Sequence, residues 1–449
     1  MSLLPLVLVA AILAADAGYG VSLGTLSQDP ILVAVTAIGP TIVILLVAWW
    51  TCRRTARHVG QGHAERMAGA AALVRLARAL VLINAIFAVL ALEWLGTIRG
   101  LTGDLVFVDE LIVMLPALGA LYLLGVAWYP IEVSIAATTG NPVPLASRWG
   151  FAWSQFSIGV LLILLPALLI VAFIEAIEAI DTSWISDAWR QVLFLVVVAA
   201  VFLGMPLVVR GLLAVRPMAP GPLRDSLLDV CDVHAVRVRE ILRWRTGGVM
   251  LNAAVVGLVG RLRYVLMTDT LVRMLPERYI EAVMAHEVGH VRRRHMPWLF
   301  LSIVSLVLLA EVALVPIPVL PRGDSLLQLG VLLVVLWVGF GWISRRFEQQ
   351  ADAFAVQHLS RSDAETELVT VEAVTTMIGT LQAIATLNGD RIRRHSWRHG
   401  SIAWRCGNLA RLAGQPRHRL PIDTVVARIK LATLVVGPAS LAVLFFLHA

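Results

Sequence analysis

Long apolar runs, separated by short polar segments, dominate the amino-acid sequence. A helix needs about 20 mostly apolar residues to cross the hydrocarbon core of a bilayer, and about nine segments approach or reach that length. We therefore predict a polytopic bundle of membrane-spanning helices. The predicted spans are Leu3–Val21, Ile31–Trp50, Leu80–Ile98, Val106–Tyr129, Phe156–Ile177, Val192–Val209, Pro297–Val315, Ser325–Ile343 and Leu431–Leu447.

The first of these segments is the weakest. Asp16 and Gly18 interrupt it, so its apolar core is short. A cleaved signal peptide would have a similar core, but no positively charged residue precedes the apolar run as a signal peptide requires. A retained span is therefore the preferred interpretation.

Two stretches of the chain, 210–296 and 344–430, are long and polar enough to fold outside lipid. A predicted hairpin of two spans, with a Pro-rich turn at Pro316–Arg322, separates them, so the two stretches could meet as one domain. The predicted division is a membrane region of about six spans at 1–209, a first polar part at 210–296, the hairpin at 297–343, a second polar part at 344–430 and a last span at 431–449.

Within the first polar part, the pattern predicts a small sheet followed by a helix. Val249–Gly257 and Arg263–Thr268 are rich in apolar and β-branched residues, with a Gly-containing break between them, which is typical of a β-hairpin. Apolar residues then recur at helical spacing over Leu275–Arg294, with Pro276 in the first turn, where proline is tolerated. The predicted fold class is mostly α, with a small β-sheet in the polar domain.

The distribution of arginine orients the predicted bundle. Arginines crowd the segment after the second span and fill both polar stretches, whereas the alternate connections hold few arginines and several acids. Because positively charged loops stay on the cytoplasmic side, both polar stretches are expected to face the cytoplasm. The N-terminus is then inside and the C-terminus outside.

Composition supports a membrane protein and argues against two other classes. The chain is 59% hydrophobic and 15% charged, against about 45–50% and about 25% in soluble domains. Its net charge of +7 comes almost wholly from arginine, but no basic patch interleaved with aromatic residues suggests a nucleic-acid partner. Cys52, Cys231 and Cys406 are widely spaced, so we expect free thiols and no cysteine metal site.

The predicted helix at Leu275–Arg294 contains the sequence His-Glu-Val-Gly-His at positions 286–290. Residues four apart lie on one face of a helix, so His286 and His290 can bind a single zinc ion. Glu287, between them, can then act as the general base on a water molecule. A pentad with three fixed residues also occurs by accident, for example on an exposed amphipathic helix. Here three arginines and His295 follow at once, which places the helix end at a polar surface just before a span.

A catalytic zinc ion needs a third protein ligand if one position is left for water. Glu348 and Asp352 are one helical turn apart just after the predicted hairpin. We expect Glu348 to bind the zinc ion and Asp352 to accept a hydrogen bond from a ligating histidine. Without the upstream pentad, the same two acids would be interpreted as solvated partners of Arg345 and Arg346.

These residues together resemble the membrane zinc metallopeptidase (gluzincin) family that includes the CAAX prenyl proteases and the bacterial heat-shock membrane protease. The similarity extends over about 215–415. The matching residues are Asn252-Ala253, Met267–Leu271, Glu281–His290, His295, Ser344-Arg345, Glu348 and Asp352, with His399–Ile402 and Arg405 similar to the family's C-terminal His-Pro motif.

The resemblance implies a zincin-like catalytic domain of helices around a small sheet, with one Zn²⁺ per chain. It also implies that a substrate peptide pairs with an edge strand, here near Asn252–Val256, with Asn252 and Ala253 as candidate substrate contacts. Gly400 stands where the family has proline, and we therefore expect no catalytic role for His399. The donor that would stabilise the oxyanion is not identified, since His358, Arg361 and the arginines of Arg391–Arg398 lack a spacing argument.

The function that these patterns favour is an integral membrane zinc endopeptidase. It would cleave membrane-associated or misfolded proteins or peptides at the cytoplasmic face, in a bacterial inner membrane. Its expected partners are the lipid bilayer and protein substrates, and neither the substrate nor the oligomeric state follows from the sequence. An antibiotic-sensor-type signalling metallopeptidase and a non-catalytic scaffold with a vestigial zinc site remain alternatives. A site-2-type intramembrane protease is disfavoured because arginines follow His290.

Overall fold

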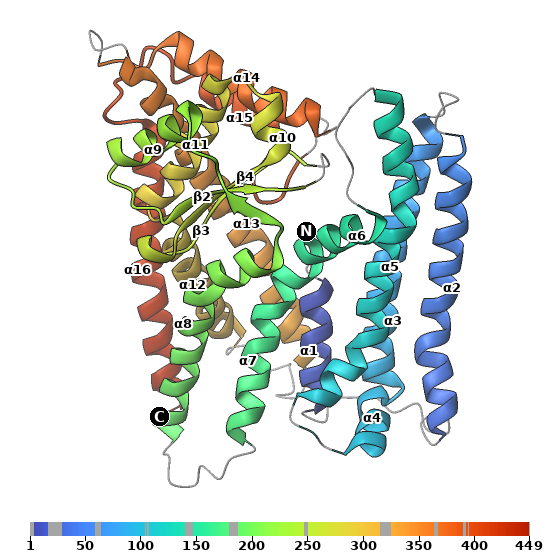
Figure 1. Cartoon of the computed structure of the whole chain (residues 1–449). Coiled ribbons are helices and arrows are strands. Elements are labelled where there is room, and N and C mark those ends of the chain that lie inside the picture. The colour runs from blue at the N-terminus through green and yellow to red at the C-terminus, as the bar shows by residue number, and fades with distance from the viewer. Residues whose placement is uncertain are drawn as a thin grey trace. The chain divides into compact units, whose positions relative to one another are not determined.

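The computed structural model describes residues 4–16, 29–58, 64–103, 105, 107–139, 147–178, 187–246, 250–314, 325–362, 367–388, 392–393 and 395–448. The chain forms two compact units. Unit 1 consists of Met1–Ala214 with Arg245–Gly248, and unit 2 of Val215–Trp244 with Val249–Ala449. Both are mainly helical, and the four-stranded sheet lies in unit 2 (Figure 1).

Unit 1 is a bundle of helices. In chain order they are α1 (Leu4–Asp16), α2 (Pro30–Ala56), α3 (Ala64–Ala91), α4 (Trp94–Thr102), α5 (Val108–Thr139), α6 (Arg148–Phe156), the π-helical turn η3 (Ser157–Leu161), α7 (Leu162–Glu178) and α8 (Asp187–Leu212). Helices α2, α3 and α5 pack against one another. Small buried side chains such as Ala37, Ala88 and Ala117 allow the close approach of these helices. Asn84 donates a hydrogen bond of 2.6 Å from Nδ2 to Ala37 O, which joins α3 to α2.

Three acidic side chains of unit 1 meet at Arg99. The guanidinium lies 2.6 Å from Asp16 Oδ1 and 2.7 Å from Glu110 Oε1, and it also pairs with Asp109. Asp109 and Glu110 are buried. Because a buried carboxylate is tolerated only when it is paired, this cluster fastens α4 to the end of α1 and to the first turn of α5.

Seven helices of the described residues are long and apolar enough to cross a membrane: Pro30–Ala56, Gly69–Ala91, Val108–Ile135, Arg148–Ile177, Val192–Leu212, His295–Leu314 and Pro421–Phe446. Each corresponds to one of the predicted spans. The first predicted span is a shorter helix, α1, and its last residues lie outside the described part of the chain. The eighth falls within the long helix α13 (Ser325–Leu359), and the turn predicted at Pro316–Arg322 is outside the described residues.

The boundary of one predicted span is wrong. The hydropathy pattern continues through Leu80–Ile98, but α3 ends at Ala91 and a separate helix, α4, begins at Trp94. Glu93 between them has a φ of 54°, in the left-handed region. Such a residue interrupts the helical hydrogen bonds, which hydropathy alone does not reveal.

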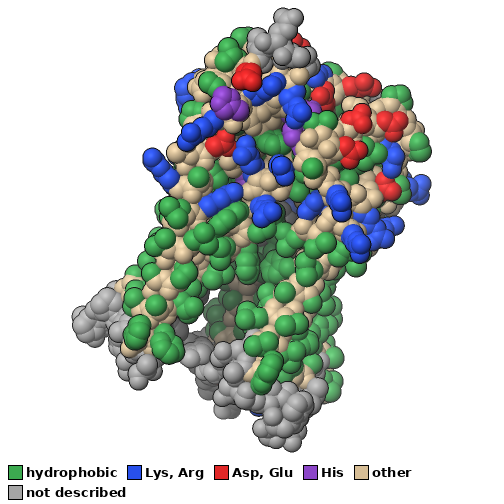
Figure 2. Space-filling model, turned by 90° about the vertical axis from the view of Figure 1, so that its left-hand side faces the viewer, with side chains coloured by type: hydrophobic (Ala, Val, Ile, Leu, Met, Phe, Trp, Pro, Cys, Tyr) green, Lys and Arg blue, Asp and Glu red, His purple; other side chains and the backbone are tan. Residues whose placement is uncertain are grey.

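The surface of the molecule separates by polarity. On the face in Figure 2, Lys and Arg side chains gather between a hydrophobic surface and a mixed surface that also carries Asp, Glu and His. This arrangement is expected where membrane helices end at lipid headgroups.

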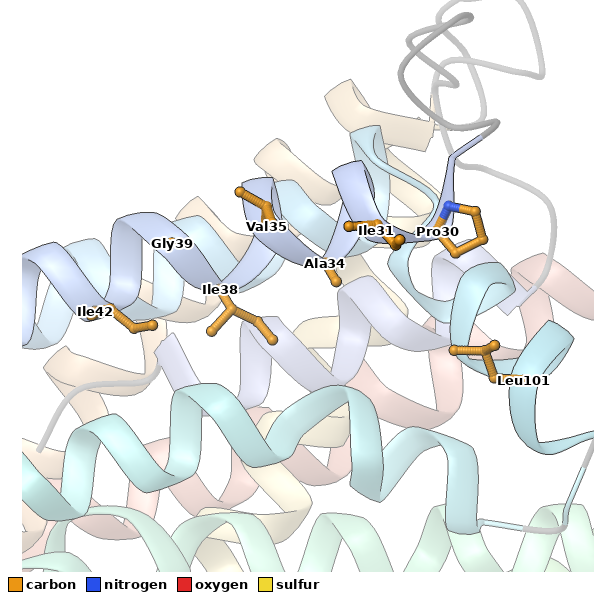
Figure 3. A pocket seen from close by; sticks show the side chains of 8 residues that line it. All are labelled: Pro30, Ile31, Ala34, Val35, Ile38, Gly39, Ile42 and Leu101. Carbon is orange, nitrogen blue, oxygen red and sulfur yellow. The ribbon is translucent and has the colours of Figure 1, made fainter.

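In unit 1, a shallow apolar groove of about 580 Å³ lies along α2 (Figure 3). It is lined by Ile31, Val35, Ile38, Ile42 and their neighbours, with Leu101 from α4.

Unit 2 combines the sheet with helices. Its elements are β1 (Val215–Pro217), α9 (Pro222–Val233), β2 (Glu240–Trp244), β3 (Ala253–Val256), the 3-10 turn η4 (Gly260–Leu262), β4 (Tyr264–Thr268), α10 (Asp269–Met274), α11 (Glu277–Arg292), α12 (His295–Leu314), α13, the 3-10 turn η5 (Ser360–Ser362), α14 (Val371–Leu387), α15 (Ile402–Ala410) and α16 (Pro421–His448).

The sheet has the strand order β1-β2-β4-β3. Strands β3 and β4 are antiparallel, with Ala253 opposite Met267, which confirms the predicted hairpin, although β3 is shorter than predicted. The sequence analysis missed β2, which runs parallel to β4, and β1, which is antiparallel to β2. A parallel partner comes from a distant segment, and neither short strand has a clear alternating pattern.

Helix α11 lies at the centre of unit 2. It packs against α13, α9, α14 and β3, and the core around it includes Leu227, Ile241, Met284 and Phe354. The predicted helix began two positions early, at Leu275 instead of Glu277, since Pro276 is the N-cap and does not lie in the first turn. Because α11 is enclosed on several sides, its side chains are held in fixed positions, and this determines the geometry of the candidate site.

Candidate metal centre and active site

Helix α11 presents its two histidines towards α13. Ile280, Met284 and Val288 are buried at helical spacing and fix the rotation of the helix. Gly289 lies against Phe354 of α13, where an added Cβ would stand 3.1 Å from the ring. A glycine at this position therefore lets the two helices approach closely, as the site requires.

The structure brings His286, His290 and Glu348 together. The Nε2 atoms of His286 and His290 are 3.2 Å apart. Glu348 Oε2 lies 3.7 Å from His286 Nε2, and Glu348 Oε1 lies 3.7 Å from His290 Nε2. Among the described residues, these three form the group of His, Cys, Asp and Glu side chains that could hold a metal ion.

The geometry and the chemistry of this group fit zinc. Donor atoms bound tetrahedrally to one zinc ion at about 2.0–2.2 Å lie roughly 3.3–3.6 Å apart, close to the separations that these three side chains already have. His286 and Glu348 are buried and His290 is half-buried. Two imidazoles and a carboxylate also leave room for a further ligand. The arrangement can therefore bind one metal ion with an open position.

The protonation states of His290 and Glu348 suit metal binding. Burial lowers the pKa of His290 to about 4, so its imidazole is neutral at pH 7. Burial alone would raise the pKa of Glu348, but the hydrogen bond with His399 and the nearby His290 hold it well below its usual range. A neutral imidazole and an ionised carboxylate are the forms that bind metals.

Asp352 supports His286 from behind. Asp352 Oδ1 lies 3.0 Å from His286 Nδ1, on the side of the ring opposite Nε2. Burial would lower the pKa of His286, but the carboxylates of Asp352 and Glu348 raise it overall. A carboxylate at Nδ1 favours the tautomer that leaves Nε2 without a proton, so this position is compatible with the role expected for Asp352 from the sequence.

Arg405 is a buried partner that the sequence analysis named but gave no role. Its Nε and Nη2 lie 2.8 and 2.5 Å from the two oxygens of Asp352, and Nη2 is also 3.9 Å from Glu348 Oε2. The guanidinium keeps the pKa of Asp352 below its usual value although burial opposes this. Arg405 therefore balances part of the charge of two buried carboxylates.

His399 lies at the site, although we expected no catalytic role for it. Its Nδ1 is 3.0 Å from Glu348 Oε1, and half of its side chain is exposed. The short turn that carries it is closed by hydrogen bonds in both directions between Ser396 and Gly400. Gly400 has a φ of +75° and donates its N–H in this turn, and proline can do neither. The departure from the His-Pro pattern therefore accompanies a different turn.

Glu287 is held beside the two histidines and the edge of the sheet. Its Oε2 accepts a hydrogen bond of 3.1 Å from Val255 N on β3. Burial raises the pKa of Glu287 to about 6. A carboxylate with a pKa near neutrality can both take and return a proton, which is what a general base and acid requires.

β3 is the edge of the sheet next to the site. Thr268 N donates to Asn252 O, so the backbone of Asn252 turns towards β4. Because backbone groups alternate in direction along a strand, Ala253 and Val255 direct theirs to the open edge. Of the two predicted substrate contacts, only Ala253 therefore has its backbone available at that edge.

Neither His358 nor Arg361, which the sequence analysis considered for stabilising the oxyanion, belongs to this cluster. His358 is part of a partly buried chain in which its Nδ1 lies 3.0 Å from His234 Nε2 and its Nε2 lies 3.2 Å from Glu281 Oε1. Arg361 is exposed. The similarity to the His-Pro motif singled out the segment of His399 but did not show which side chains either histidine contacts.

Comparison with known proteins places this site within a recognised segment. Residues 246–405 match the family model described as Peptidase family M48, and that range includes the three candidate metal ligands together with Glu287, Asp352, His399 and Arg405. No curated protein matches the chain. Among solved structures, the chain is similar to the crystal structure of S. mikatae Ste24p, with a TM-score of 0.37 and 14% identity, over 84% of this chain and 98% of that one.

Proposed function

We propose that the protein is an integral membrane zinc endopeptidase, because residues 246–405 match the family model described as Peptidase family M48 and the described residues include seven candidate membrane spans. The observation that carries the proposal is the cluster of His286, His290 and Glu348, whose donor atoms lie within 4.8 Å of one another. These three side chains would hold one Zn²⁺. Glu287 is the general base, and Asp352 orients His286.

The chemistry is the hydrolysis of a peptide bond. When bound, zinc supplies a Lewis acid that polarises the scissile carbonyl and favours deprotonation of a water molecule. Glu287 takes a proton from the water while the water oxygen bonds to the carbonyl carbon. Glu287 then gives that proton to the amine as the C–N bond breaks, so the products are a carboxylate and an amine. His399, half-exposed beside Glu348, is the side chain to which we assign stabilisation of the carbonyl oxygen.

The substrate is proposed to bind as an added strand along β3. The open edge offers the backbone groups of Ala253 and Val255, and the N–H of Val255 lies within hydrogen-bond distance of Glu287. Binding through main-chain hydrogen bonds demands little of the substrate sequence. We therefore infer that unfolded or extended segments of membrane-associated proteins are the substrates.

We infer that the site faces the cytoplasm. Arginines fill the polar stretches that carry the site residues, and positively charged segments remain on the cytoplasmic side. In a bacterial cell this would be the inner face of the cytoplasmic membrane. Labelling of a cysteine introduced at the exposed His418 in intact cells and in opened vesicles would test the orientation; rapid labelling in intact cells would contradict it.

The catalytic role of Glu287 can be tested with one matched pair of variants. Purified wild-type protein is expected to contain about one zinc ion per chain. Glu287→Gln should keep the zinc but cleave an extended, membrane-anchored reporter peptide about 10²–10⁴-fold more slowly, because a general base is lost. Glu277→Gln, at an exposed position of the same helix, is the control and should cleave normally.

Two results would overturn the proposal. One is wild-type protein that binds no zinc when metal is supplied. The other is Glu287→Gln cleaving the reporter as fast as Glu277→Gln. Comparison of membrane proteins from wild-type and Glu287→Gln cells would then identify substrates as uncleaved precursors.

A further inference from the structure

A chain of three hydrogen bonds runs from His290 to the first turn of α16. His290 Nδ1 lies 2.9 Å from His295 Nδ1, and His295 Nε2 lies 2.9 Å from Gln350 Oε1. Gln350 Nε2 donates a hydrogen bond of 2.6 Å to Asp423 Oδ1. The chain thus joins α11, the start of α12, α13 and α16.

The positions of the protons along this chain follow from its far end. The Asp423 carboxylate can only accept, so the Gln350 amide must direct its NH₂ group towards Asp423 and its oxygen towards His295. His295 therefore carries its proton on Nε2, and the Nδ1 of the neutral ring is an acceptor. His290 must then donate from Nδ1, which leaves its Nε2 with a lone pair facing His286 and Glu348.

The surroundings leave His295 and Gln350 little freedom to rearrange. His295 is fully buried and Gln350 is 4% exposed. The His295 ring stacks on Phe347, with ring centroids 4.6 Å apart and planes 18° apart. Asp423 is also fixed, because its Oδ2 accepts from Leu420 N at 3.2 Å and its Oδ1 lies 3.4 Å from Arg293 Nη2.

We propose that His295, Gln350 and Asp423 are positioning residues that set the tautomer of His290 and hold its Nε2 in place to bind metal. The inference rests on the proposed metal centre. The two histidine ligands are then oriented differently, His286 by the carboxylate of Asp352 and His290 by a neutral imidazole. Through this chain, the helix that contains the candidate span Pro421–Phe446 is connected to the metal site.

The acceptor at His295 can be tested with two substitutions of nearly equal size. In His295→Asn, the amide oxygen can stand where Nδ1 stood and still accept from His290. In His295→Leu, no acceptor remains, while both variants lose the bond to Gln350. We expect His295→Leu to bind zinc about 10-fold more weakly than His295→Asn, since loss of an outer-shell partner costs about 10–100-fold in metal affinity. The measurement is the zinc dissociation constant of the full chain, by competition with a chelator.

The link to α16 can be tested by exchanging the amide of Gln350 and the carboxylate of Asp423. Gln350→Met removes both of its hydrogen bonds, so the tautomer of His295 is no longer set, and zinc affinity should fall about 10-fold. In the double variant Gln350→Glu with Asp423→Asn, a carboxylate again accepts from His295 and the new amide donates to it. Zinc affinity should recover to within about threefold of wild type.

A purely structural role predicts other results. It would lower the thermal stability of the metal-free protein equally in His295→Asn and His295→Leu, and the double variant would bind zinc as weakly as Gln350→Met. If the two variants of each pair bind zinc with equal affinity, His295, Gln350 and Asp423 do not position His290. That conclusion holds even if wild-type protein binds zinc and cleaves the reporter peptide. Absence of zinc binding by wild-type protein would instead overturn the proposed function. If His295→Leu does not fold, the comparison of Gln350→Met with the double variant is the test of the proposal.

Discussion

At the scale of single residues, the site depends on charge balance in a buried place. Asp352 and Glu348 are both buried, and Arg405 is the guanidinium that contacts them. Their negative charge would be costly without it, because a buried charge must be paired. The ion pair of Arg405 and Asp352 is therefore part of the candidate metal site, together with the three proposed ligands.

Replacement of Arg405 should destabilise the fold strongly. In Arg405→Met the carboxylate of Asp352 loses two hydrogen bonds, and removal of one partner of a buried ion pair costs about 3–5 kcal/mol. We expect the free energy of unfolding to fall by that amount and zinc affinity to weaken, as measured by chemical denaturation in detergent and by chelator competition. Arg411→Met, at an exposed position nearby in sequence, is the control and should change stability by less than about 0.5 kcal/mol. Equal stability of the two variants would contradict this account of Arg405.

At the scale of elements, the edge strand β3 is proposed to bind substrate through its backbone. Ala253→Pro removes an outward N–H while the bond from Val255 N to Glu287 is kept, and proline is tolerated on an edge strand whose N–H faces away from the sheet. We expect kcat/KM for an extended reporter peptide to fall by about 10-fold or more, as loss of one main-chain hydrogen bond at a reacting site implies. Zinc content should be unchanged. Normal cleavage by the variant would show that substrate does not pair with this edge.

The turn that carries His399 is anchored to α13. Trp397 Nε1 donates a hydrogen bond of 2.6 Å to Trp337 O, and Arg345 Nη1 donates one of 2.8 Å to Trp397 O. The Trp397 ring covers Gly341, where an added Cβ would stand 2.3 Å from Nε1. A side chain at Gly341 must therefore displace Trp397 and with it the turn at Ser396–Gly400.

Gly341→Ala should lower kcat while zinc still binds, because His399 moves and the three proposed ligands do not. The expected loss in kcat is about 10-fold, typical of a misplaced catalytic group, and steady-state kinetics with zinc analysis would measure it. Gly407→Ala is the matched control, since an added Cβ there meets nothing within 4 Å. If the two variants have the same kcat, the anchoring of this turn has no catalytic importance.

At the scale of the whole of unit 2, a second, partly buried hydrogen-bond chain couples stability to pH. His234, at the end of α9, contacts His358 of α13, which contacts Glu281 of α11, and Glu281 lies 2.9 Å from Arg278 Nη1. Burial lowers the pKa of His234 to about 4. The hydrogen bond from His358 lowers the pKa of Glu281. Folding therefore favours a neutral His234 and an ionised Glu281.

Both shifts predict that acid destabilises unit 2. The unfolded chain binds a proton at His234 near pH 6.5, whereas the folded protein does so only near pH 4, so this contribution to stability is lost as pH falls from about 6.5 towards 4. The contribution of Glu281 is lost below its ordinary pKa of 4.5. His234→Gln should show a smaller fall in thermal midpoint between pH 7 and pH 5 than wild type. The exposed His418→Gln should behave as wild type, and a pH dependence unchanged in His234→Gln would refute the assignment.

Several features of this protein follow from residues close together in the chain. The apolar runs predict spans because the length of a helix across lipid is fixed, and seven of them correspond to candidate spans in the structure. The hairpin of β3 and β4 follows from two short β-prone runs and the break between them. The positions of His286, Glu287 and His290 on one helix follow from the helical repeat alone. Glu348 and Asp352 were identified by the same spacing and by the ligand number that zinc requires.

Tertiary structure decided which side chains from distant segments of the chain are in contact. The close approach of α11 and α13 at Gly289 brings Glu348 to the histidines. The contact of His399 with Glu348, the pairing of Arg405 with Asp352 and the chain from His290 to Asp423 each join segments that no local pattern connects. Local spacing specifies which side chains share a helix face, whereas the packing of whole helices determines which faces meet. The sequence by itself therefore determined the chemistry of the candidate site, and only the fold determined the partners that hold it in place.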